Sequence, residues 1–210
     1  MSNKGKLKKY LKLYLVTDSE ILKNRDFYKS IEDAIKGGVK IIQLREKNAS
    51  GKEFLEKAIK LRELTKKYDA LLIINDRIDI AILSNADGVH VGQSDIDANL
   101  VRKLLGEDKI IGVSAKTIDQ AQKAKLNGAD YIGVGAMYNT STKLDAKCIK
   151  FDTVKEIRKN VDIPIVLIGG ISIDKIKELK ELDSDGYAIV SAILKKDDIY
   201  LETKRFISII

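Results

Sequence analysis

Gly133-Val-Gly-Ala-Met-Tyr-Asn-Thr-Ser-Thr-Lys143 joins a strand-like run to a polar loop, and the same kind of junction recurs along the chain. The run from Tyr131 to Val134 is apolar enough to be a buried strand. The loop then carries four successive hydrogen-bond donors, Thr140 to Lys143, which could converge on an anionic ligand. A loop that follows a strand in an α/β protein lies on the ligand-binding side of the sheet. Taken alone, the pattern also fits a solvated connection.

Short apolar runs alternate with amphipathic helical patterns over the whole chain. The runs are nearly continuous in Val, Ile and Leu, which is typical of parallel strands buried on both faces. Eight runs occur, at 13–16, 39–44, 71–74, 88–91, 110–113, 131–134, 165–168 and 186–190. The helical patterns between them include 27–36, 52–67, 98–105, 118–127, 151–159 and 173–182.

This alternation predicts an α/β fold, a single (β/α)8 TIM barrel formed as one domain by residues 1–210. The loops are short, and neither a linker nor a shift in composition divides the chain. A doubly wound open sheet is the competing fold. It would need an amphipathic edge strand, and the sequence has no convincing one.

Composition favours a cytoplasmic protein. The apolar runs are too short to span a membrane, and the Lys-rich start, Met1 to Lys12, lacks the apolar segment of a secretory signal. The single cysteine, Cys148, fits a reducing compartment. Because His90 is the only histidine, a Cys/His nucleophile pair and a cysteine-based zinc site are not expected. We expect His90 to be a structural histidine inside its strand.

The net charge of +7 reflects surface composition rather than a nucleic-acid site. Basic residues are interleaved with acidic ones along the helical patterns, as in Lys52, Glu53, Glu56 and Lys57, which indicates a solvated, ion-paired face. No cluster of Arg with aromatic residues occurs. We therefore expect partners that are small molecules, with no nucleic acid and no membrane.

The residues after the strands could do chemistry together, because a barrel places them all at one end. Asp76 and Asp95 offer the carboxylates that Mg²⁺ prefers, although either could instead cap the following helix. Arg45 and Lys47 follow a strand on the same alternation as Gln43 and suit a diphosphate.

Two further strand ends suit a phosphate group or a structural role. Gly170 and Ser191 lie near predicted helix starts, where bare N–H groups favour a phosphate, although a glycine pair also suits a tight turn. Glu46 could simply hold a basic neighbour.

Eight motifs in order, covering nearly the whole chain, make it resemble the thiamine-phosphate synthase family. They are Gln43-Leu-Arg-Glu-Lys47, Ile74-Asn-Asp-Arg77, Gly88-Val-His-Val-Gly-Gln-Ser-Asp95, Gly112-Val-Ser-Ala115, Gly128-Ala-Asp-Tyr-Ile-Gly-Val-Gly135, Thr140-Ser-Thr-Lys143, Ile168-Gly-Gly-Ile171 and Val190-Ser-Ala192. The resemblance implies a Mg²⁺-dependent transferase that joins a hydroxymethylpyrimidine diphosphate to a thiazole phosphate, or its carboxylated form, and releases pyrophosphate. It also implies a pyrimidine carbocation that the thiazole nitrogen captures.

The resemblance assigns roles to individual residues. Asp76 and Asp95 would bind the metal. The pyrimidine diphosphate would contact Gln43, Leu44, Arg45, Glu46, Lys47, Asn75, Ser114 and Lys143. The thiazole phosphate would contact Thr140, Ser141, Thr142, Gly170, Val190 and Ser191. Arg45, Lys47, Ser114 and Lys143 would serve catalysis, and the connection from Ala136 to Lys150 would close as a lid.

One departure and two alternatives accompany the resemblance. The family commonly has Pro and Phe before its Thr-x-Thr-Lys, whereas this chain has Ala136-Met-Tyr-Asn139. A related thiazole tautomerase, an isomerase on the same barrel, would need neither Mg²⁺ nor a diphosphate site. A non-catalytic barrel that binds phosphate or nucleic acid is the more distant alternative.

Overall fold

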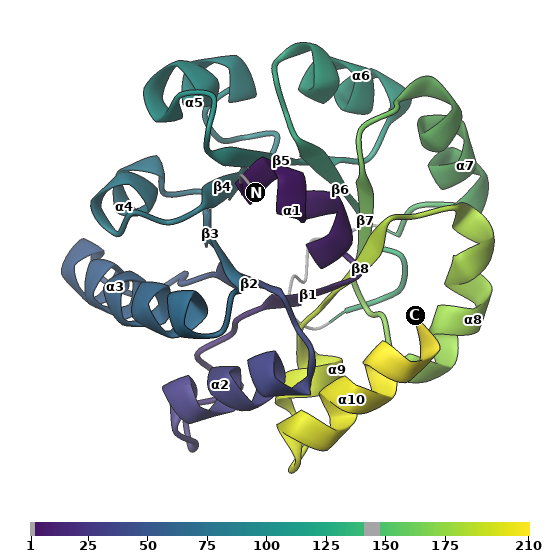
Figure 1. Ribbon diagram of the computed structural model, residues 1–210. Coiled ribbons are helices and arrows are strands. Elements are labelled where there is room, and N and C mark those ends of the chain that lie inside the picture. The colour runs from purple at the N-terminus through teal and green to yellow at the C-terminus, as the bar shows by residue number, and fades with distance from the viewer. Residues whose placement is uncertain (1–2, 141–147) are drawn as a thin grey trace.

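The fold is a closed barrel of eight parallel strands surrounded by helices, as the sequence predicts (Figure 1). A computed structural model describes residues 3–140 and 148–210. Each strand pairs with the next along the chain, and β1 pairs with β8, which excludes an open sheet. The strands are β1 (Leu13–Val16), β2 (Ile41–Leu44), β3 (Leu71–Asn75), β4 (Gly88–Val91), β5 (Ile110–Ala115), β6 (Tyr131–Gly135), β7 (Ile165–Ile168) and β8 (Gly186–Ile189).

Helices form the outer ring. They are α2 (Phe27–Gly37), α3 (Gly51–Lys67), α4 (Ile78–Leu83), α5 (Ala98–Leu105), α6 (Ile118–Leu126), α7 (Phe151–Asn160), α8 (Ile176–Leu179), α9 (Ser191–Leu194) and α10 (Ile199–Ile209), with short 3₁₀ turns at Ile173–Lys175 and Lys180–Leu182. The second strand starts later than predicted. Val39 donates its N–H to Ala34 at the end of α2 and does not join the sheet.

The strand side chains divide into two apolar layers because alternate residues face opposite sides of the barrel wall. One set fills the barrel interior, with Tyr14, Ile73, Tyr131 and Val166 among its members. The other set, which includes Leu44, packs outward against the helices. Both layers are buried, which explains why the strands read as continuous apolar runs.

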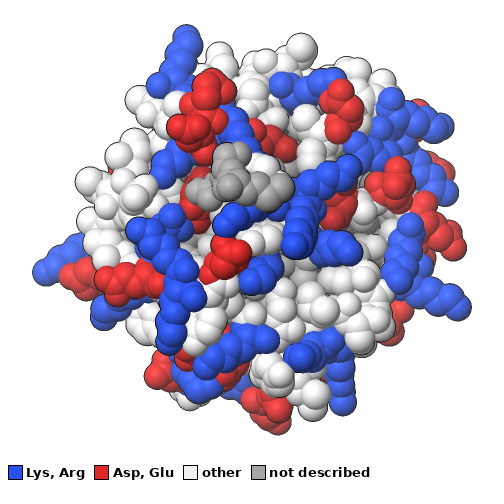
Figure 2. Space-filling model, in the orientation of Figure 1, with Lys and Arg blue, Asp and Glu red and all other residues white. Residues whose placement is uncertain are grey.

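An additional helix, α1 (Asn3–Tyr10), lies across the amino-terminal end of the barrel (Figure 1). This helix was not predicted, because the Lys-rich composition of the segment conceals three apolar side chains at helical spacing. Leu7, Tyr10 and Leu11 are buried and join the interior layer. The helix therefore seals one end of the barrel. Basic and acidic side chains are interspersed over this face (Figure 2).

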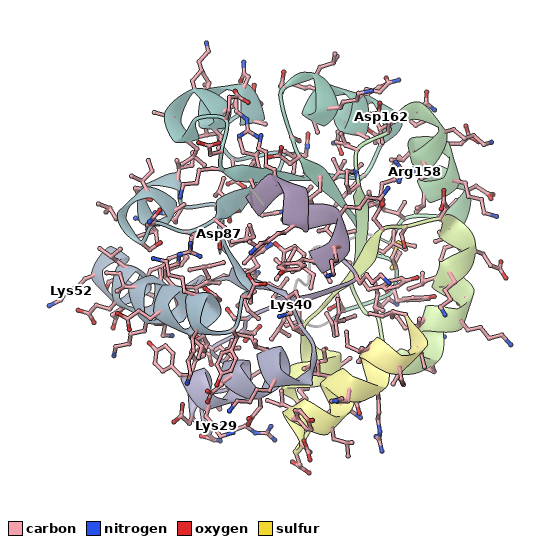
Figure 3. All side chains as sticks on the ribbon, viewed as in Figure 1. Lys29, Lys40, Lys52, Asp87, Arg158 and Asp162 are labelled. Carbon is pink, nitrogen blue, oxygen red and sulfur yellow. The ribbon has the colours of Figure 1, made fainter. Side chains whose placement is uncertain are left out.

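Three Asp–Arg clamps repeat around the same end of the barrel. Asp87, Asp130 and Asp185 each precede an even-numbered strand and accept the N–H of the neighbouring odd strand, from Leu72, Ile111 and Ile165 at 2.8, 2.8 and 2.9 Å. Each carboxylate also pairs with an arginine, from Arg62 on α3, Arg102 on α5 and Arg158 on α7. Figure 3 labels Asp87 and Arg158. These charges are largely buried, and each is paired with a charge of opposite sign.

Candidate active site

Two carboxylates that follow neighbouring strands lie together at the carboxyl-terminal mouth of the barrel. Asp76 follows β3 and adopts a left-handed backbone with φ of 61°. Its N–H donates to the carbonyl of His90 at 2.9 Å, and the Asn75 amide donates to its carboxylate at 2.6 Å. Asp95 follows β4 and accepts the Gly92 N–H at 2.7 Å.

Neither aspartate caps a helix. The cap positions of α4 and α5 are held by Arg77 and Asp97, so the helix-cap alternative is wrong for both Asp76 and Asp95. Their carboxylates instead lie within hydrogen-bonding range of each other. Two adjacent carboxylates supply oxygen ligands of the kind that Mg²⁺ prefers.

The acidic pair is electrostatically unfavourable by itself. Loss of hydration at the mouth and the neighbouring Asp95 carboxylate raise the pKa of Asp76 to about 6, although Asn75 and Arg45 oppose the rise and Asp76 keeps solvent contact. Two carboxylates held together in this way favour a shared proton or a bound cation.

Arg45 and Lys47 follow β2 at the same mouth. The Arg45 N–H donates to the Thr17 hydroxyl at 3.0 Å, which fixes the main chain, and the Arg45 side chain is near enough to Asp76 to act on its charge. Lys47 is exposed. Within residues 3–140 and 148–210, neither side chain forms an ion pair. Two basic groups at a barrel mouth are therefore available to an anionic ligand.

The other two members of this segment point elsewhere. The Glu46 side chain is only 6% exposed and binds Lys57 on α3 at 2.9 Å and Ser19 at 2.6 Å, which is the structural role considered for it. The Leu44 side chain is buried in the outer apolar layer. Contact of either residue with a substrate would therefore have to come through the main chain.

Gln43 and Ser114 form part of the floor of the mouth. The Gln43 amide donates to the Tyr14 hydroxyl at 2.7 Å, inside the barrel. Ser114, on β5, lies 2.9 Å from Nε2 of His90, and the other ring nitrogen of His90 lies 3.0 Å from the Tyr131 hydroxyl. Both nitrogens of His90 are thus partnered, in agreement with a structural histidine. Neither Tyr14 nor Tyr131 was predicted to belong to the site. A tyrosine within an otherwise aliphatic, inward-facing strand was the available signal.

The glycine pair after β7 lets the loop after β6 approach closely. Gly169 and Gly170 have φ of 99° and 65°, and a Cβ on Gly170 would lie 2.6 Å from the Asn139 carbonyl oxygen. The Tyr138 N–H donates to the Gly169 carbonyl at 3.0 Å. Gly170 is therefore both a tight turn and a neighbour of the segment that leads to Thr140.

The remaining residues predicted for the thiazole phosphate fall partly inside the described structure. Val190 is the cap position of α9, and Ser191 is its first residue, half-buried beside the mouth. Thr140 is the last residue described before the gap. Ser141, Thr142 and Lys143, and with them the middle of the predicted lid, lie outside the described residues.

The segment Ala136-Met-Tyr-Asn139, which departs from the family pattern, is held by hydrogen bonds and by ring packing. Met137 donates its N–H to the Ile168 carbonyl at 2.9 Å, and Ile149 donates to Ala136 at 2.8 Å. The Tyr138 hydroxyl donates to Glu178 at 2.8 Å, and its ring packs edge-on against Phe151. Side-chain contacts to α7 and α8 thus hold the start of the loop.

A closed parallel barrel whose polar and charged groups gather at the carboxyl ends of its strands is typical of (β/α)8 enzymes. Comparison with known proteins identifies the family within this class. The thiamine monophosphate synthase family model matches residues 13–193, and the chain belongs to this family. No helix among the described residues is long and apolar enough to cross a membrane.

Individual relatives agree over nearly the full length. The chain is 64% identical to a thiamine-phosphate synthase of Clostridioides difficile, with 98% of both chains covered. It is 55% identical to that of Clostridium tetani, with 89% and 90% covered. Among solved structures, a thiamine phosphate pyrophosphorylase from Pyrococcus furiosus superposes with a TM-score of 0.89 at 35% identity, covering 97% of this chain and 96% of the other.

Proposed function

We propose that this chain joins a hydroxymethylpyrimidine diphosphate to a thiazole phosphate to give thiamine phosphate and pyrophosphate, or to the carboxylated thiazole phosphate to give the same two products and CO₂. One observation carries the proposal: Asp76 and Asp95 face each other beside Arg45 at the mouth of a barrel that belongs to this family. A thiazole tautomerase has no use for such an acidic pair. The same pair does suit a reaction that must bind and release a diphosphate with a divalent cation.

The donor set fits Mg²⁺. No group of three or more His, Cys, Asp or Glu side chains is poised for a metal anywhere in the described ranges. The protein would therefore supply the carboxylates of Asp76 and Asp95, and the diphosphate and water would complete the coordination, as is usual for this ion. When bound, Mg²⁺ would offset negative charge on the departing diphosphate.

The reaction breaks the bond between the pyrimidine methylene carbon and the diphosphate oxygen, and the electron pair leaves with the diphosphate. The resulting carbocation accepts the lone pair of the thiazole nitrogen, which forms the new C–N bond. Arg45 and Lys47 would bind the diphosphate and stabilise the charge that grows on its leaving oxygen. Gly170, Val190 and Ser191 would hold the thiazole phosphate and so place the nitrogen close to the cation.

Several assignments remain predictions. They are the roles of Thr140, Ser141, Thr142 and Lys143, the contacts of Asn75 and Gln43 with the pyrimidine diphosphate, and any main-chain contact of Leu44 or Glu46. The cytoplasmic location and the single domain over residues 1–210 are also proposals, the second supported by the barrel closure between β1 and β8.

The test is a coupled assay with both phosphorylated precursors, with and without Mg²⁺, in which thiamine phosphate and pyrophosphate are measured together. Equal amounts of the two products, formed only with Mg²⁺, are expected. Asp95→Asn should abolish both, whereas the control Asp97→Asn, two residues away in an exposed ion pair with Lys123, should retain them. Mg²⁺-independent isomerisation of a thiazole carboxylate phosphate, without pyrophosphate release, would instead identify a tautomerase.

A further inference from the structure

Five polar side chains form one continuous hydrogen-bonded relay through the barrel, from Gln43 to Ser114. The Gln43 amide nitrogen lies 2.7 Å from the Tyr14 hydroxyl, which lies 2.8 Å from the Tyr131 hydroxyl. The Tyr131 hydroxyl lies 3.0 Å from Nδ1 of His90, and Nε2 of His90 lies 2.9 Å from the Ser114 hydroxyl. The relay thus joins two residues predicted to contact the pyrimidine diphosphate and passes through three that were not.

The direction of the relay follows from its first donor. The Gln43 nitrogen can only donate, so the Tyr14 oxygen accepts and the Tyr14 hydrogen is left for Tyr131. The Tyr131 hydroxyl then donates its own hydrogen to Nδ1 of His90. The opposite direction at either tyrosine would leave a buried phenolic hydrogen without an acceptor, which is costly, and both tyrosines are only 1% exposed.

This direction determines the tautomer of His90. Nδ1 accepts from Tyr131, so the ring proton must be on Nε2, which donates to the Ser114 oxygen. With an acceptor at Nδ1 and a donor at Nε2, the ring carries one proton and is neutral. Burial raises the pKa of both tyrosines, so both remain protonated, as this pattern requires.

The neighbouring strands leave room for the relay. Gly112 lies between His90 and Tyr131 in the sheet register, and a Cβ there would come within 2.2 Å of the Tyr131 ring and 2.5 Å of Nδ1 of His90. A Cβ on Gly133 would come within 3.0 Å of the His90 ring. Glycines at both positions therefore allow the two rings to meet.

We infer that Tyr14, Tyr131 and His90 are positioning residues that hold the Ser114 hydroxyl as a donor toward the pyrimidine diphosphate. Ser114 accepts from His90 on its inner side, so its hydrogen is directed to the mouth, where it meets a hydrogen-bond acceptor of the substrate. Serine could otherwise present either a hydrogen or a lone pair. The relay removes this choice before substrate arrives. The inference rests on the proposed function for the identity of the acceptor, but the tautomer of His90 does not depend on it.

The tautomer can be measured directly. His90 is the only histidine, so a long-range ¹H–¹⁵N spectrum of uniformly ¹⁵N-labelled protein at neutral pH contains a single imidazole. In the substrate-free protein we expect a protonated Nε2 and an unprotonated Nδ1. Tyr131→Phe should remove this bias and change both ring shifts. A protonated Nδ1 in the unaltered protein would reverse the relay and overturn the inference.

Kinetics separates positioning from simple packing. Tyr131→Phe should lower kcat/KM for the pyrimidine diphosphate about tenfold, the loss expected for one hydrogen bond, with KM for the thiazole phosphate unchanged. In a Ser114→Ala background the same substitution should have no further effect, because Tyr131 acts through Ser114. The matched control is Tyr68→Phe, which removes a hydroxyl that donates to Glu32 on the outer ring and should leave kinetics and ring shifts unchanged.

Two outcomes would overturn the inference without touching the proposed function. One is full additivity of the Tyr131 and Ser114 substitutions in a protein that makes thiamine phosphate. The other is an equal loss in kcat/KM for both substrates, together with a lower melting temperature, which would mark Tyr131 as a packing residue. An inactive protein that nevertheless shows the Nε2 tautomer would mean that the proposed function fails while the relay stands.

Discussion

The two ends of this barrel differ in the partners of their acidic residues. At the amino-terminal end, Asp87, Asp130 and Asp185 each meet an arginine and a main-chain N–H. At the carboxyl-terminal end, Asp76 lies beside Asp95, and loss of hydration together with the Asp95 carboxylate raises the pKa of Asp76. One end therefore satisfies its charges internally, and the other leaves them to be satisfied by something that binds.

The difference extends to the basic groups. Arg62, Arg102 and Arg158 are engaged in ion pairs, whereas Arg45 and Lys47 have none within the described residues. The basic groups without an ion pair thus lie at the end where an anionic ligand would pair with them. Substitutions at the two ends should separate activity from stability.

The largest effect should come from removing one charge of the acidic pair. Asp76→Asn keeps a side chain that tolerates the left-handed backbone, so the substitution isolates the charge. We expect kcat/KM to fall about 1000-fold, equivalent to about 4 kcal/mol, with the melting temperature unchanged or higher because carboxylate repulsion is removed. Asp79→Asn, in an exposed pair with Arg77, is the control. A lower melting temperature in Asp76→Asn would show that the pair is structural.

The converse result is expected at the other end. Asp87→Ala leaves Arg62 buried without its partner and the Leu72 N–H without its acceptor. The free energy of unfolding should fall by about 3 kcal/mol, as measured by urea denaturation, with kcat of the folded enzyme unchanged. Glu156→Ala, which breaks an exposed pair on α7, should cost less than about 1 kcal/mol. Equal losses in the two variants would contradict a buried clamp.

The helix α1 provides a third comparison. Leu7 is 4% exposed and packs into the barrel interior, so Leu7→Ala should lower the free energy of unfolding by about 2 kcal/mol through lost burial and a residual cavity. The same deletion at Leu126, which is 85% exposed, should be nearly neutral. Calorimetry of both variants tests whether α1 stabilises the barrel. Retention of full stability in Leu7→Ala would mean that it does not.

The smallest effect concerns the metal alone. Mg²⁺ at ten times its Kd should stabilise the folded protein by about 1.4 kcal/mol, because it binds only where Asp76 and Asp95 are brought together. The shift should disappear in Asp76→Asn and remain in Asp87→Ala. NaCl at matched ionic strength controls for screening. Stabilisation of Asp76→Asn by Mg²⁺ to the same extent would place the cation elsewhere.

The strands could be predicted because each is buried on both faces, so each one reads as a continuous apolar run in the sequence. The structure confirms the barrel and places all eight strands within two residues of their predicted limits. Four helices lie outside the predicted helical ranges, namely α1, α4, α9 and α10. In α1 the few buried residues are surrounded by lysines, and α10 completes the ring by packing against α2, a contact between residues far apart in the chain (Figure 1).

The candidate site was predictable in part for the same geometric reason. Neighbouring parallel strands end side by side, so the proximity of Asp76 and Asp95 follows from their positions after β3 and β4. The direction of individual side chains does not follow. Glu46 turns to Lys57, and the relay depends on contact between Tyr14 and Tyr131, which are 117 residues apart. Contacts across the barrel interior require the closed structure before they can be seen.

The repeated clamps also bear on how the chain folds. Each joins a helix, the next odd strand and the following even strand, and the paired side chains are only 25, 28 and 27 residues apart. Contacts this local form early, because little chain entropy is lost in closing such short loops. The position before β2 has Lys40 in place of an aspartate. We therefore expect three clamped modules to assemble first and β1 to join last, so that amide hydrogens of β1 exchange before those of β3 to β8.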